Sequence, residues 1–375
     1  MNFGFTEEQE LLRAEVRKLL DARCPVPEVR KLMETDAGYS ADLWKELAEL
    51  GWLGLTIPEA FGGAGLGWVD FVVLLEETGR SLFPSPLIST TLAAAAILDN
   101  GSDEQKARWL PSLADGSRVG TLALLEASEV IGPAGITLLG KPDGDAFVLS
   151  GEKRFVHDAG AASLFVVAFR TGPSAEDLAL AVLDAGAPGV KARSFPTMDQ
   201  TKRLGTLALE NARVPKSALL GAPGRAWPAI ARLFDRGAIA VTGEIIGAAE
   251  GAHALTVQYA KDRLQFGAQI GKYQGVKHPL AEMYVDIEST KSLLYYAAWA
   301  LDESPADVPR SASLAKAYAT DAFTRIGIDG VQLHGAVGYT AEYDIQLYLK
   351  RAKWARPAFG DADFHYERVA ALGGS

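Results

Sequence analysis

The stretch YAKDRLQFGAQIGKYQ, residues 259–274, decides how this sequence is interpreted. It begins like a helix, carries a cation and an aromatic ring at Arg263 and Phe266, and then meets Gly267 and Gly271. Glycine tolerates the backbone conformations of tight turns, so the spacing predicts a helix that ends in a loop. The question is why a cation and a ring stand at that end.

The composition is that of an ordinary globular protein. The chain has 375 residues, which is long for one hydrophobic core and suits about two or three domains. Its residues are 48% hydrophobic and 22% charged, which argues against disorder. The formal net charge of −10 opposes non-specific binding to nucleic acid, so we expect no nucleic-acid partner.

The sequence also limits the compartment. A single cysteine, Cys24, excludes an internal disulfide and a thiolate metal cage. The first residues, MNFGFTEEQE, are acidic and polar, unlike a signal peptide or an Arg-rich transit sequence. No run reaches the roughly 20 apolar residues that a membrane span needs. We therefore expect a soluble cytoplasmic protein that does not bind a membrane.

Local patterns divide the chain into three regions. Residues 1–117 have helical spacing, and Thr6 with Gln9 and Ser102 with Gln105 have capping-box spacing. Residues 118–222 contain short apolar runs such as ASLFVVAFR, separated by Gly, Asp and Pro, with no room for the helices of a parallel sheet.

Residues 223–375 return to long helices, which we expect at about 227–262, 277–303, 310–334 and 343–370. The predicted fold class is α+β. It consists of an N-terminal helical domain, a middle antiparallel β domain and a C-terminal four-helix bundle.

Several familiar motifs are absent or misleading. The run FGGAGLG, residues 61–67, lacks the G-x-G-x-x-G spacing of a dinucleotide site, and Pro58 interrupts the strand that should precede it. We interpret it as a flexible link. The sequence has no phosphate-binding P-loop and no G-x-S-x-G, and its five histidines never have metal-ligand spacing. We therefore predict no metal site.

A second motif completes the interpretation of the first. IDGVQLHGAVGYTAEYDIQLYLKRAK occupies residues 328–353. Together with YAKDRLQFGAQIGKYQ it resembles the acyl-CoA dehydrogenase family, and the α–β–α order extends the resemblance over nearly the whole chain. The resemblance implies bound FAD, an acyl-CoA substrate and an electron-transfer flavoprotein as redox partner.

The resemblance assigns cofactor contacts to six residues. Arg263 and Gln265 would bind the FAD pyrophosphate, for which the planar fork of arginine is suited, and Phe266 would lie against the cofactor. Gln274 would reach it from the next turn. Gln332 and Gly335 would lie along the ADP half of a FAD held mostly by another subunit. Alternatively, Arg263 pairs with a surface acid and the glycines only end the helix.

The middle domain departs from the family pattern. Relatives with ordinary fatty acyl substrates carry a Thr-Glu-Pro-Gly-rich turn and a Trp-Ile-Thr strand at the flavin. This sequence has LLEASEVIG, residues 124–132, and RFVHDAG, residues 154–160, at those places. Phe155 and His157 are candidates to line the isoalloxazine.

The general base is also unusual. Many relatives carry it on a glutamate in a C-terminal turn, which aligns here with ARPAFGDAD, residues 355–363. Phe359 stands at the glutamate position and cannot accept a proton, while Asp361 and Asp363 are out of register.

Some relatives carry the base on the helix before the Arg-x-x-Phe-Gly segment. There Glu244 has only small or apolar neighbours at i±3 and i±4, namely Ala240, Val241, Gly247 and Ala248. A buried carboxylate without a partner is costly, so Glu244 is the candidate base and Glu250 a weaker one. The alternative is a glutamate that only packs against a neighbouring helix or subunit.

The implied reaction is the α,β-dehydrogenation of an acyl-CoA to trans-2-enoyl-CoA, with the base removing the α-proton and flavin N5 taking the hydride. Because it lacks the C-terminal glutamate, the sequence resembles a bacterial branch of the family. Members of that branch act on bulky CoA thioesters such as steroid side chains, often as α₂β₂ heterotetramers. We expect a homotetramer or such a heterotetramer, since the helix face SLLYYAAWAL, residues 292–301, is too apolar for solvent. The alternative is a non-catalytic partner subunit that only completes the FAD site.

Overall fold

The computed structural model describes residues 4–373. Six helices come first: α1 Glu7–Arg23, α2 Val26–Met33, α3 Ala41–Glu49, α4 Trp68–Arg80, α5 Leu87–Asn100 and α6 Asp103–Ala114. Seven strands follow: β1 Gly120–Ala123, β2 Gly140–Asp143, β3 Ala146–His157, β4 Leu164–Arg170, β5 Leu178–Asp184, β6 Val190–Phe195 and β7 Leu204–Pro215. The C-terminal part has the helices α7 Trp227–Asp262, α8 Gln274–Glu303, α9 Val308–His334, α10 Ile345–Ala355 and α11 Ala362–Gly373, and the short strands β8 Leu264–Gln265 and β9 Ala268–Gln269.

This order confirms the predicted helix–sheet–helix architecture. Both predicted capping boxes are present at the starts of α1 and α6. The last predicted helix, 343–370, is in fact two helices, α10 and α11, separated by a turn at residues 356–361. Among the described residues, no helix is long and apolar enough to cross a membrane.

The middle region has two sheets. Strands β2-β3-β7-β6 form an antiparallel sheet, and β1-β4-β5 form a second one. In the second sheet β4 and β5 are antiparallel, but β1 and β4 are parallel, with Gly120 opposite Leu164. The middle domain is therefore antiparallel as predicted in its other strand pairs, and this parallel pair is the exception. The β2–β3 hairpin lies in the connection between β1 and β4. This long connection, which contains no α-helix, satisfies the geometry of a parallel pair.

The chain forms two compact units. The bundle unit comprises the residues up to Met33, Gly67–Phe83 and the residues from Asp235 on, and the sheet unit comprises Glu34–Leu66 and Pro84–Phe234. Each is described by itself below. The division into domains at 1–117, 118–222 and 223–375 stays a prediction.

A row of glycines sets the packing of the bundle unit. Gly243, Gly247 and Gly251 are spaced one helical turn apart on α7. A Cβ built on Gly247 would stand 1.7 Å from the carbonyl oxygen of Glu76, and one on Gly79 of α4 would stand 2.1 Å from that of Glu244. The backbones of α4 and α7 are therefore in direct contact. This contact fixes the position of Glu244 relative to α4.

Candidate cofactor site

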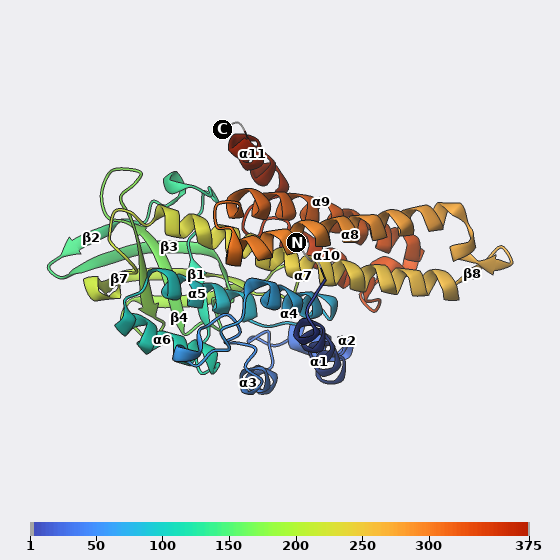
Figure 1. The fold of residues 1–375 in the computed structure, drawn as a ribbon, viewed down its shortest axis with the longest axis horizontal. Coiled ribbons are helices and arrows are strands. Elements are labelled where there is room, and N and C mark those ends of the chain that lie inside the picture. Colours follow the sequence, from blue (N-terminus) through green and yellow to red (C-terminus); the bar gives the residue numbers. More distant parts are fainter. Residues whose placement is uncertain (1–3, 374–375) are drawn as a thin grey trace. The chain divides into compact units, whose positions relative to one another are not determined.

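The opening stretch ends in a tight hairpin at the end of the α7–α8 pair (Figure 1). Strands β8 and β9 pair Leu264 with Gln269 and Gln265 with Ala268, which leaves Phe266 and Gly267 as the two turn residues. Their φ angles are 52° and 77°. A two-residue hairpin whose central residues both have positive φ is a type I′ turn, and that conformation is unfavourable for phenylalanine.

The turn presents Phe266 to solvent. Its side chain is 94% exposed. The Tyr273 hydroxyl donates to the carbonyl oxygens of Gln265 and Phe266 at 3.2 and 3.4 Å, so the hairpin is held from the side of α8. A strained turn that exposes a large apolar ring indicates a binding role, because folding alone does not favour it.

Arg263 is exposed beside this turn and forms no ion pair with another described residue. The adjacent acid, Asp262, instead accepts hydrogen bonds from Gln258 Nε2 at 3.0 and 2.9 Å. Among the described residues, Arg263 therefore does not pair with a surface acid of its own chain, as the alternative interpretation would require. The guanidinium is available to bind an anion.

The second motif lies at the same end of the bundle unit. The ring of Tyr259, on α7, stacks on His334 at the end of α9 with a centroid distance of 4.4 Å. The ring centroid of Tyr343 lies 5.1 Å from that of His334. This aromatic cluster joins the two motifs, so the exposed residues Gln332 and Gly335 are held beside the end of α7. Gln274 is also exposed, at the start of α8.

These side chains fit FAD as the implied cofactor. A free guanidinium suits a pyrophosphate, and an exposed ring suits a flat conjugated system. All six predicted cofactor residues are exposed, and no side chain of the unit covers Phe266. Exposed apolar surface of this kind is normally covered by a ligand or a neighbouring subunit. That the site is shared between subunits stays a prediction.

Glu244 is buried as expected, but it is not without a partner. Its side chain is 2% exposed, and Oε2 lies 3.4 Å from Nη1 of Arg351 on α10. Arg351 is itself buried and donates to the carbonyl oxygen of Leu82 at 3.3 Å. The expectation of an unpartnered carboxylate is wrong, because the periodicity of α7 does not show which residue the neighbouring helix supplies. Arg351 was missed for the same reason.

The other acidic candidates are engaged in local contacts. Glu250 forms an ion pair with Lys291 at 2.6 Å. Asp361 accepts from the backbone N–H of Phe364 at 2.9 Å and so caps the start of α11. Asp363 is exposed in the first turn of α11.

Phe359 occupies the turn between α10 and α11 with a φ of +57°. Its side chain packs on α7 at Gly237, where an added Cβ would meet a ring carbon at 2.3 Å. Gly237 precedes Glu244 by seven residues, about two helical turns. The region of α7 two turns before Glu244 is therefore covered by an aromatic ring. The nearby carboxylate of Asp235 on the same helix forms an ion pair with Arg368.

The flavin candidates of the sheet unit lie at an irregular end of β3. Phe155 has a φ of +53°, and the pairing of β3 with β7 shifts between Lys153 and Val156. Such a bulge redirects side chains. Burial, with a smaller contribution from Lys202, lowers the pKa of His157 to about 4, so its imidazole is neutral at pH 7.

The loop 124–132 is fixed by a buried ion pair. Lys153 Nζ lies 2.7 Å from Glu126 Oε1, and the Glu126 carboxylate also accepts from the backbone N–H groups of Thr137 and Leu138. These bonds to the Glu126 side chain hold the conformation of the loop.

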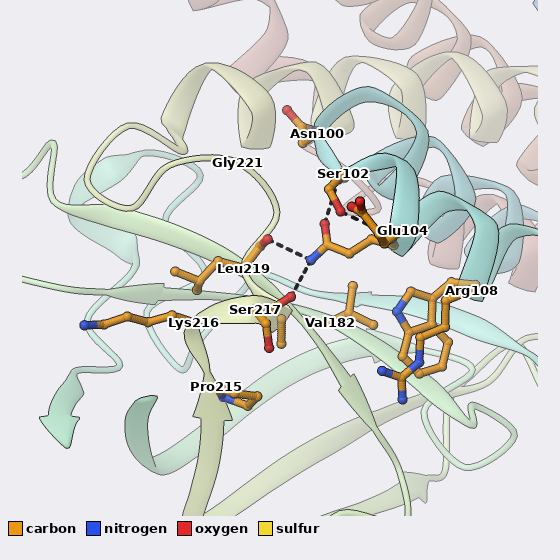
Figure 2. A pocket seen from close by; sticks show the side chains of 14 residues that line it. Asn100, Ser102, Glu104, Arg108, Val182, Pro215, Lys216, Ser217, Leu219 and Gly221 are labelled. Carbon is orange, nitrogen blue, oxygen red and sulfur yellow. Dashed lines mark hydrogen bonds between the residues drawn. The ribbon is translucent and has the colours of Figure 1, made fainter. Parts of the chain in front are cut away.

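Figure 2 shows a pocket of about 770 Å³ in the sheet unit, between the start of α6 and the segment 215–219. Gln105 Nε2 donates across it to the carbonyl oxygens of Ser217 and Leu219 at 2.8 and 2.9 Å. None of the predicted site residues lines this pocket. Its central polar group is satisfied internally, so we assign it no role in the chemistry.

Comparison with known proteins agrees with the two motifs. The family profile of the acyl-CoA dehydrogenase N-terminal domain matches residues 6–117, and that of the C-terminal domain matches residues 224–372. The chain is 33% identical to the acyl-CoA dehydrogenase IpdE2 of Mycolicibacterium smegmatis over 367 residues, which are 98% of this chain and 99% of that protein.

Solved structures show the same architecture. The fold is similar to that of butyryl-CoA dehydrogenase from Megasphaera elsdenii, with a TM-score of 0.91, 26% identity and coverage of 100% of both chains. It is also similar to a chain of the ChsE4–ChsE5 complex from Mycobacterium tuberculosis, with a TM-score of 0.90, 28% identity and coverage of 100% of this chain and 99% of that one. The chain therefore belongs to the acyl-CoA dehydrogenase family of FAD-dependent oxidoreductases that act on acyl-CoA.

Proposed function

We propose that the chain takes part in the α,β-dehydrogenation of an acyl-CoA to trans-2-enoyl-CoA, with FAD bound by Arg263, Gln265, Phe266, Gln274, Gln332 and Gly335. The observation that carries this proposal is the stacking of Tyr259 on His334, which joins the two motifs. Beside them lies Arg263, which has no acidic partner within residues 4–373. Bound FAD supplies the hydride acceptor. The chain supplies the cofactor surface and, in this first form of the proposal, the base.

Glu244 is the base that we propose for the catalytic form. Its carboxylate lies on α7 against Arg351, which would hold it in one orientation. A base in this place has to reach the α-proton from a buried position, so the local contact between α7 and α10 has to open for the substrate. Glu244→Gln keeps the shape and removes the basic lone pairs.

The test is flavin reduction in the purified, FAD-loaded protein. Glu244→Gln should slow reduction by an acyl-CoA by about 10²–10⁴-fold, the usual contribution of a general base, with normal flavin content and melting temperature. Glu250→Gln is the matched control and should reduce at nearly the wild-type rate. Reduction by Glu244→Gln at the wild-type rate would end the assignment.

A second candidate function is favoured by Phe359. The turn that carries the base in many relatives here carries an aromatic ring packed on Gly237, and Glu244 is occupied by Arg351. Both observations support a chain that completes the FAD site of a catalytic partner but removes no proton itself. The similarity to a chain of the two-component ChsE4–ChsE5 complex supports the same reading.

Co-expression with a paralogous chain separates the two candidates. If the chain is catalytic, the protein purified alone is yellow, and an acyl-CoA bleaches its flavin. If it is a partner subunit, bleaching requires the paralogue and is lost when the base of the paralogue is removed. Glu244→Gln would then leave the rate of the complex unchanged.

The remaining partners stay predictions. We propose an electron-transfer flavoprotein as electron acceptor, a homotetramer or α₂β₂ heterotetramer as the assembly, and bulky acyl groups such as steroid side chains as substrates. The cytoplasm remains the predicted compartment.

A further inference from the structure

Lys316 is a buried lysine that makes three of its four hydrogen bonds to one turn. It lies on α9 with 0% of its surface exposed. Its Nζ donates to the carbonyl oxygens of Ala355, Arg356 and Gly360 at 3.0, 3.1 and 2.8 Å. A fourth acceptor is Thr320 Oγ1 at 3.1 Å. No carboxylate of the described residues forms an ion pair with it, so its hydrogen bonds are to neutral oxygens alone.

The side chain of His365 also hydrogen-bonds to the backbone of this turn. His365 Nε2 donates to the carbonyl oxygen of Phe359 at 3.0 Å, and its Nδ1 accepts from Ser313 Oγ at 3.2 Å. Four backbone carbonyls of residues 355–360 are therefore turned inward onto Lys316 and His365. Phe359 and Gly360 have φ angles of +57° and +103°. The value at Phe359 is unfavourable for phenylalanine, and the bonds to Lys316 and His365 hold the turn in this conformation.

A buried ammonium is expensive, and a methionine would fill the same space at lower cost. We propose that Lys316 is a positioning residue. By holding the carbonyls of the turn 355–360, its ammonium fixes the ring of Phe359 against Gly237 and so sets the surface that the turn presents to the acyl group. This inference rests on the proposed function, since the turn aligns with the one on which many relatives carry the base that acts on the acyl-CoA.

The first test concerns the turn itself and needs no substrate. Lys316→Met in the FAD-loaded assembly should raise hydrogen exchange of peptides covering 356–361 by about tenfold, because the three carbonyls lose their donor. The control is Lys153→Met, which removes the buried lysine of the sheet unit and should leave those peptides unchanged. Wild-type exchange at 356–361 in Lys316→Met would overturn the proposal.

The second test asks whether Lys316 acts through Phe359. Binding of octanoyl-CoA and of a branched acyl-CoA is titrated by the change in flavin absorbance in Lys316→Met, Phe359→Ala and the double variant. We expect Lys316→Met to weaken binding about fivefold or more in the wild-type background and less than about twofold beside Phe359→Ala. Equal factors in both backgrounds would contradict the proposal.

Two further outcomes are distinguishable. If Lys316→Met does not fold, Lys316→Gln keeps part of the donor capacity and should lie between wild type and the expected loss in both tests. If wild type binds neither thioester, alone or with a paralogue, the proposed function fails and with it the acyl-CoA part of the inference. The exchange experiment still decides whether Lys316 positions the turn.

Discussion

Phe266 has a backbone conformation that its side chain disfavours, in a turn where Asn-Gly would be the ordinary choice. The sequence motif predicted a loop with a cation and an aromatic ring at this place. In the structure both side chains are exposed to solvent. The ring is exposed, and Arg263 has no acidic partner among the described residues. At the scale of single residues, the proposed site is indicated by an exposed apolar ring and an arginine without an acidic partner in the described part of the chain.

Replacement of Arg263 by lysine tests this reading. A point charge cannot form the paired hydrogen bonds of a guanidinium with a pyrophosphate, so Arg263→Lys should weaken FAD binding by about tenfold or more. Flavin retention after gel filtration and titration of the apoprotein with FAD measure the loss. Arg225→Lys, at an exposed position of the sheet unit, is the control and should retain wild-type flavin content.

His365 predicts a pH dependence of stability. Burial, together with the nearby charge of Lys316, lowers its pKa to about 3, well below the model-peptide value of about 6.5. Between these values the unfolded chain binds a proton that the folded chain does not, so this group makes stability rise with pH. The slope for one proton is at most about 1.4 kcal/mol per pH unit.

His365→Gln should flatten the melting temperature profile between about pH 4 and 6.5 relative to wild type. The glutamine cannot gain a charge, and it can still serve as both donor and acceptor. His278→Gln, at an exposed histidine, should keep the wild-type slope. An unchanged slope in His365→Gln would show that His365 is not neutral in the folded protein at these pH values.

At the scale of elements, local signals were predictable and distant pairings were not. The two capping boxes and the limits of α7 and α9 followed from spacing and composition, because those signals lie within a few residues of each other. The parallel pairing of β1 with β4 depends on strands about 40 residues apart. The contact of Glu244 with Arg351 joins residues 107 positions apart, and neither helix alone specifies it.

The contact between α4 and α7 yields a prediction for helix packing. Gly247→Ala would place a Cβ against the carbonyl oxygen of Glu76, so the two helices have to separate. We expect a loss of about 1–3 kcal/mol in the free energy of unfolding, measured by denaturant titration. Gly275→Ala is the matched control, because nothing lies within 4 Å of its Cβ position. That change should be neutral or stabilise by up to about 1 kcal/mol.

At the scale of the whole molecule, the exposed apolar side chains of the proposed cofactor surface lead us to predict a neighbouring subunit. Phe266, Leu264 and Tyr339 are 94%, 63% and 74% exposed in the single chain. Apolar side chains gathered at the end of a unit are normally covered by a subunit or a ligand. The sequence predicted a tetramer, but it does not determine whether all four chains are identical, because the residues that would decide this lie on the partner.

The assembly prediction is checked by mass and flavin content together. We expect a particle of four 39.9 kDa chains, or two such chains with two of a paralogue, at micromolar concentration. Analytical ultracentrifugation with flavin absorbance gives both the mass and the number of FAD molecules per chain. A stable monomer that binds FAD in full would contradict the shared site.

The glycine row on α7 also restricts how this gene can vary. Every single-nucleotide change in a glycine codon that alters the amino acid without stopping translation gives Ala, Ser, Cys, Val, Asp, Glu, Arg or Trp, and each of these has a Cβ. At Gly247 there is room for none of them. Every amino-acid change that one nucleotide can make at Gly247 therefore disturbs this contact. The crossing of α4 and α7 can change in evolution only if a second change in α4 arises with the first.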